Sequence, residues 1–152
     1  MKDIDFAYTR GLDDEEIDAM LGEMGHGVLS LARDGEAYAV PVVYHYDGDT
    51  FFFRLGMAPG SKKRDFVETT ETATFVVYEA EGTPDPEELD TWSVVATGPL
   101  RELTDAERMS FPTAAEINRD FPPIRVFDEP IDELEIELYA MDHETLTGRT
   151  TE

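Results

Sequence analysis

The strongest constraint on the fold of this chain is a succession of short strand-like runs joined by tight turns. Asp34-Gly35 and Asp47-Gly48-Asp49 carry the residues that hairpin turns favour, and apolar runs flank both of them. The runs cover residues 27–33, 36–46, 50–55, 71–79, 91–103 and 133–141. Consecutive short strands with tight turns predict a mainly β (α+β) fold, an antiparallel barrel or sandwich with helices packed at its ends.

Two helices are predicted from capping signals. Residues 12–24 have Asp13 as the N-cap and Glu16 three positions later, which is the pattern of a capping box. Residues 62–68 follow Ser61, a residue that commonly caps a helix. The first helix precedes all the strands, and the second separates the third strand from the fourth.

Other residues interrupt the strands or end them. Pro41 cannot donate a ladder hydrogen bond, so it marks a bulge, an edge, or a place where something other than a strand lies alongside. Gly98-Pro99 interrupts the fifth strand, and Thr104 with Glu107 predicts a short helix after it. Residues 145–149 are expected to form a short tail.

Composition limits the classes of function. With 152 residues and 41% hydrophobic residues, we expect a single globular domain over residues 1–152. The formal net charge is −23, from 35 acidic and 12 basic residues, which argues against nucleic acid and anionic membranes as partners. Such an acidic surface suits a salt-rich, halophilic cytoplasm, where ions screen the self-repulsion. Residues 1–5 do not resemble a signal peptide, so we expect a cytoplasmic protein.

The few basic residues gather at one place. Four of the 12 lie within residues 54–64, namely Arg54, Lys62, Lys63 and Arg64. Cations in the first turn of a helix oppose its dipole, and the free backbone N–H groups point the same way. A docked anion such as a phosphate would resolve this conflict. The alternative is a solvated basic patch that pairs with nearby carboxylates, and the charges alone do not separate the two.

No pattern in the sequence nominates a catalytic side chain. The three histidines lack the spacing of a zinc site, and the chain has no cysteine. There is no nucleophile elbow, Walker loop or dinucleotide fingerprint. With 35 acidic residues, any proposed catalytic pair of carboxylates would be arbitrary. If the protein is an enzyme, the chemistry is therefore expected to belong to a cofactor.

Four stretches, in this order and spacing, resemble a known family. They are residues 27–31, 37–44, 51–63 and 92–98. The chain resembles the pyridoxamine 5'-phosphate oxidase-like, FMN-binding split-barrel proteins, and most closely the branch that includes nitroimidazole-resistance-type flavoproteins. The resemblance implies a six-stranded antiparallel split barrel, and a homodimer with two FMN sites at the interface.

The resemblance also implies positions for the cofactor-binding residues. Ser61, Lys62 and Lys63 match the element that holds the FMN phosphate, and Arg54 would add a phosphate or ribityl contact. The strand around Val40 to Val43 would run along the flavin ring, and Trp92 would reach the flavin from the partner subunit or simply pack in the core or interface. The complete set is Val40, Pro41, Val42, Val43, Phe53, Arg54, Ser61, Lys62, Lys63, Trp92 and Ser93.

The leading functional hypothesis is an FMN-dependent oxidoreductase that passes hydride through flavin N5 to a small acceptor, with a nicotinamide as donor. Alternatives are a flavin-binding carrier without turnover, a deazaflavin-dependent reductase, and a cofactor-free interaction module. The basic substrate-phosphate residues that dedicated vitamin-B6 oxidases carry near the C-terminus are absent here. True pyridoxamine-phosphate oxidase activity is therefore not expected.

Overall fold

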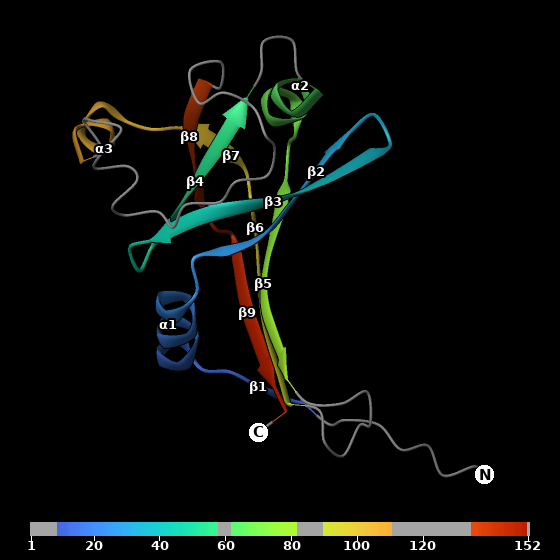
Figure 1. Ribbon diagram of the computed structural model, residues 1–152, viewed down its shortest axis with the longest axis vertical. Helices are drawn as coiled ribbons and strands as arrows, with labels where there is room; N and C mark the ends of the chain where they lie inside the picture. Colours follow the sequence, from blue (N-terminus) through green and yellow to red (C-terminus); the bar gives the residue numbers. More distant parts are fainter. Residues whose placement is uncertain (1–8, 58–61, 82–89, 111–134, 152) are drawn as a thin grey trace.

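The strands form one antiparallel sheet in the computed structural model, which describes residues 9–57, 62–81, 90–110 and 135–151. The sheet has nine strands in the order β1-β9-β6-β5-β2-β3-β4-β8-β7 (Figure 1). The strands are β1 (Arg10–Gly11), β2 (His26–Arg33), β3 (Glu36–Tyr46), β4 (Thr50–Met57), β5 (Ala73–Glu81), β6 (Asp90–Gly98), β7 (Leu100–Glu102), β8 (Glu135–Asp142) and β9 (Thr145–Thr150). This largely antiparallel sheet with few helices confirms the predicted fold class.

Three helices accompany the sheet: α1 (Asp14–Glu23), α2 (Lys62–Thr69) and α3 (Asp105–Ser110). The capping box of α1 is confirmed, because the backbone N–H of Glu16 donates to Asp13 Oδ1 (2.8 Å) and that of Asp13 donates to Glu16 Oε1 (3.2 Å). Figure 1 shows α1 beside the lower part of the sheet and α2 at its upper end. The predicted helices at the ends of the β structure are therefore present.

The core forms because successive side chains of each strand point to opposite faces of the sheet. Phe51, Phe53 and Leu55 of β4 point into the main core, where each is at most 1% exposed. Phe66 of α2 and Phe75 of β5 belong to the same core. The intervening residues of β4 point the other way. On that second face a smaller cluster consists of Val43, Phe52, Leu103 and Ala140, with Leu138 packed against it.

The sheet has three strands more than the six predicted, and the first of them is β1, which pairs with β9. The fifth predicted strand divides at Gly98-Pro99 into β6 and β7, as the interruption suggested. The prediction of a tail over residues 145–149 is wrong, because these residues lie in β9, which pairs with β6 from Thr145 to Thr150. Gly148 weakens the strand signal, but the bare backbone is needed there: a Cβ would lie 2.7 Å from Leu12 Cδ1.

β3 and β4 separate along part of their length, which opens the sheet. β3 pairs with β2 from Glu36 to Val43, but it pairs with β4 only from Val43 to Tyr46. From Leu55 onward β4 continues along β8 alone. No strand of the described chain pairs with β3 over residues 36–42 on the β4 side. Pro41 lies in this stretch, as expected of a proline where a strand lacks a neighbour.

Candidate functional site

The candidate site lies where β3 and β4 separate. Arg54 is the last residue of β4 that pairs with β3, opposite Val43, and on its other side it pairs with Leu138 of β8. The chain then runs through Met57, the end of β4, and resumes in the described structure at Lys62, the first residue of α2. The open edge of β3, the end of β4 and the start of α2 therefore border one region. Ser61, the predicted cap of α2, is outside the described residues.

Arg54 is a partly buried cation that has no counter-charge among the described residues. Its side chain leaves β4 on the face of the second cluster, since its neighbours Phe53 and Leu55 point into the main core. Burial lowers the pKa of its guanidinium, although an arginine stays protonated. Within the described part of the chain, Arg54 makes no hydrogen bond or ion pair. A desolvated charge of this kind is costly unless an anion compensates it.

Lys62 is the most accessible cation of the cluster. Its side chain is 62% exposed, and its Nζ lies 3.8 Å from Glu36 Oε2, a carboxylate that is equally exposed. The ammonium also lies 5.8 Å from the centroid of the Tyr38 ring and 5.5 Å from that of Phe66. An exposed ion pair at this distance contributes little stability, so an incoming anion can displace Glu36 at small cost.

Lys63 and Arg64 turn toward the sheet. Lys63 Nζ donates to the backbone carbonyl of Gly56 (2.8 Å), and Arg64 Nη1 lies 2.8 Å from Glu137 Oε1. Tyr139 donates its hydroxyl to the other oxygen of Glu137 (3.2 Å). The solvated-patch alternative, in which the cations pair with carboxylates, therefore describes Arg64 well. Lys62 is only loosely paired with a carboxylate, and Arg54 is paired with none among the described residues.

The remaining predicted positions fall into two groups. Val40, Pro41, Val42 and Val43 lie on β3 along and beside its unpaired stretch, whereas Phe53 is fully buried in the main core. Trp92 and Ser93 lie near the start of β6, where Trp92 pairs with Glu79. Glu79 is six residues from Ala73, the first residue of β5. Trp92 therefore lies roughly 20 Å from the end of the β5–β6 hairpin that is next to α2. Figure 1 likewise shows α2 at the upper end of the sheet and the start of β6 at the lower end.

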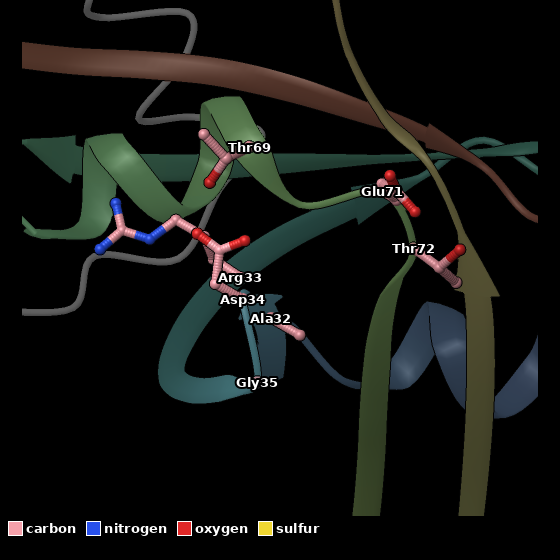
Figure 2. Close-up of a pocket in the computed structure, with 7 residues that line it drawn as sticks. All are labelled: Ala32, Arg33, Asp34, Gly35, Thr69, Glu71 and Thr72. Carbon is pink, nitrogen blue, oxygen red and sulfur yellow. The ribbon is translucent and has the colours of Figure 1, made fainter.

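A separate hollow lies at the C-terminal end of α2. It has a volume of about 510 Å³ and is lined by Ala32, Arg33, Asp34, Gly35, Thr69, Glu71 and Thr72. Figure 2 shows the β2–β3 turn on one side of it, with the end of α2 and the residues before β5 on the other. Arg33 is not free to receive a ligand there, because its guanidinium stacks 4.9 Å from the centroid of the Phe66 ring. None of the predicted cofactor-binding residues lines this hollow.

Sequence reasoning missed Glu137 and Tyr139. Both lie in the predicted strand over residues 133–141, where acidic residues alternate with apolar ones, a pattern that assigns Glu137 to the solvent. Instead, Glu137 is partly buried with a side chain 30% exposed, and Tyr139 next to it points into the main core. Burial, followed by the nearby Glu137 carboxylate, raises the pKa of Tyr139 to about 12. A tyrosine two residues from Glu137 was the available signal, but Arg64, the other partner of Glu137, is distant in the sequence.

Comparison with known proteins defines the class of fold and then the family. The fold is a split antiparallel barrel that is shared with solved structures of low sequence identity. The family model described as pyridoxamine 5'-phosphate oxidase matches residues 13–150, so the chain belongs to that family. No curated protein matches the chain.

Three solved structures illustrate the similarity. A FAD-binding protein from Mesorhizobium loti is 21% identical, with 93% of this chain and 97% of that chain covered and a TM-score of 0.63. A protein from Bacteroides thetaiotaomicron, described as a 5-nitroimidazole antibiotic resistance protein, is 16% identical, with 94% and 87% covered and a TM-score of 0.66. The FAD binding protein from Mycobacterium smegmatis is 18% identical, with 91% and 96% covered and a TM-score of 0.63.

The described residues contain neither a membrane-spanning helix nor a cluster of metal ligands. No helix among them is long and apolar enough to cross a membrane. No group of three or more histidine, cysteine, aspartate or glutamate side chains in these residues is arranged to hold a metal ion.

Proposed function

We propose that this protein binds a flavin nucleotide, FMN in the first instance, in the region where β3 and β4 separate. The observation that carries the proposal is Arg54, a partly buried guanidinium at the point of separation that has no counter-charge in the described part of the chain. Lys62 adds an exposed ammonium at the start of α2, where backbone N–H groups of a first helical turn favour an anion. Each of the two cations suits an anionic group of the ligand, such as its phosphate.

The unpaired edge of β3 suits the flavin ring. Residues 36–42 have no strand neighbour on the β4 side within the described chain, so their backbone groups on that side are available to a planar ligand with polar edges. Val40 and Val42 flank Pro41 in this stretch. When bound, the flavin would supply hydride transfer at N5, and the residues of this chain would orient the ring and exclude water from one of its edges.

We further propose that the functional unit is a homodimer. Trp92 and Ser93 lie at the end of the β5–β6 hairpin that is remote from α2, so one protomer cannot bring them to its own phosphate-binding residues. Tyr78, which pairs with Ser93, is 61% exposed, an unusual setting for a large aromatic residue. A second copy would bury Tyr78 and complete the site with Trp92 and Ser93.

Oxidoreductase activity with a small acceptor remains the leading proposal for the reaction. FAD is the second candidate cofactor, since two of the similar structures are described as FAD-binding proteins. A holoprotein that no nicotinamide reduces in a stopped-flow experiment would favour the carrier without turnover. A deazaflavin titration run in parallel tests the third alternative.

A charge reversal at Lys62 tests the binding site. Because Lys62 is largely exposed and only loosely paired, Lys62→Glu should leave the fold intact while weakening FMN binding at least about tenfold, the scale of replacing an attraction by a repulsion in a partly screened site. Riboflavin, which lacks the phosphate, should bind equally to both proteins. Arg108→Glu, the same charge change on exposed α3, is the matched control and should not alter FMN binding. Equal FMN affinity of Lys62→Glu and the wild type would refute the site.

A further inference from the structure

We propose that Arg64, Glu137 and Tyr139 form a strut that positions the start of α2 for anion binding, and that Arg64 does not bind the anion itself. This inference rests on the proposed function, and it names positioning residues for the same site.

The Glu137 carboxylate is held at both of its oxygens. Arg64 Nη1 lies 2.8 Å from Oε1, and the Tyr139 hydroxyl donates to Oε2 at 3.2 Å. The side chains of Arg64 and Glu137 are 26% and 30% exposed, so the pair is shielded from solvent to a greater extent than the pair of Lys62 and Glu36. Charge-assisted hydrogen bonds with limited solvent access are stronger and more directional than exposed ones.

The strut connects the helix to a rigid part of the sheet. Glu137 lies opposite Leu55 in the β4–β8 register, and both Leu55 and Tyr139 belong to the main core. Arg64 is in the first turn of α2, so its contact with Glu137 fixes the turn whose N–H groups would face the anion. Lys63 also holds the first turn of α2 to β4, because its Nζ donates to the carbonyl of Gly56, one residue beyond Leu55.

The arrangement also removes an electrostatic conflict. A cation in the first turn of a helix opposes the dipole, and Glu137 neutralises this charge for Arg64. The helix therefore keeps its free N–H groups and the exposed Lys62 for the ligand, while Arg64 is already committed to a carboxylate. A preorganised first turn binds an anion more tightly than one that must be ordered on binding.

The test is a double-mutant cycle on Arg64→Gln and Glu137→Gln, with FMN and riboflavin affinities measured by fluorescence quenching. The strut predicts that each single variant weakens FMN binding about fivefold to tenfold, and that the double variant is no weaker than the singles because they break one unit. Riboflavin affinity should change little, since it lacks the phosphate. Tyr139→Phe should give a smaller loss of FMN affinity in the same direction.

A direct role of Arg64 gives the opposite result. If Arg64 bound the phosphate, Glu137→Gln would release the guanidinium and strengthen FMN binding, and Arg64→Gln would weaken it in either background. That outcome, or unchanged FMN affinity in both single variants, would overturn the strut. Glu107→Gln is the matched control: it breaks another arginine–glutamate pair, Arg101 with Glu107 at 2.7 Å, and should leave FMN affinity unchanged. A wild type that binds no flavin would instead refute the proposed function.

Discussion

Adding a single methyl group at Gly27 should destabilise the protein severely, while the same change at Gly22 should stabilise it. Gly27 is buried in β2, and a Cβ there would lie 2.5 Å from the backbone oxygen of Val76 and 2.7 Å from Cζ of Phe75. Both distances are well inside van der Waals contact. The carbonyl cannot retreat without disturbing the pairing of β2 with β5, and the Phe75 ring is enclosed in the main core at 1% exposure.

The magnitude follows from these contacts. Overpacking a rigid core costs about 1–3 kcal/mol, and the backbone clash places Gly27→Ala at about 3 kcal/mol or more. Gly22 is the second-last residue of α1 with nothing within 4 Å of a new Cβ, so Gly22→Ala should gain up to about 1 kcal/mol from helix propensity. The two variants should therefore differ by about 4 kcal/mol in free energy of unfolding.

Urea unfolding followed by circular dichroism, in buffer with high salt, measures this difference from the transition midpoints. Gly27→Ala should shift the midpoint to lower urea and Gly22→Ala to higher urea, with similar slopes. If Gly27→Ala is as stable as the wild type, β2 and β5 do not approach as closely as described. A loss of stability in Gly22→Ala would mean that this face of α1 is packed.

Further predictions concern charge and the packing of α1. Hydrogen bonds from Arg101 lower the pKa of Glu107 from 4.5 to about 2, so this carboxyl stabilises the fold fully above pH 4.5, and that stability is lost as the pH falls from 4.5 toward 2. Acid unfolding should be less steep in Glu107→Gln over this window, and identical acid unfolding curves would contradict the assignment. Because the net charge is −23, thermal stability should rise between about 0.1 M and 1 M salt as the screening length falls from about 10 to 3 Å, and a flat response would exclude repulsion as a major cost. Gly148→Ala should lower the free energy of unfolding by about 1–3 kcal/mol, because its Cβ would press on Leu12 and Ile17, and wild-type stability in urea would show that α1 can yield.

Local features of the fold were predictable because their physics is local. The cap of α1 depends on Asp13 and Glu16, three residues apart, and the β2–β3 turn depends on Asp34-Gly35, where both residues adopt positive φ angles of 48° and 82°. β9 was missed because it forms by pairing with β6, and its own residues do not show that pairing. Gly148 lowers the strand propensity of this segment, but packing against Leu12 and Ile17 requires a glycine there.

The candidate site, too, was predictable only in part. The concentration of cations at residues 54–64 was visible in the sequence. The fate of each cation was not, because Arg64 is paired with Glu137 in a strand that follows more than 70 positions later, and the isolation of Arg54 depends on the faces of three strands. Pro41 was a weak sequence signal that residues 36–42 of β3 do not pair with β4.

The central claim is that the region between β3, β4 and α2 binds a flavin. The most direct measurement is gel filtration of the purified protein with added FMN in high salt, with the visible absorption spectrum recorded across the elution profile. We predict that flavin absorption co-elutes with the protein at the position of a dimer. Protein that elutes without flavin absorption after incubation with FMN, FAD or a deazaflavin would contradict the claim.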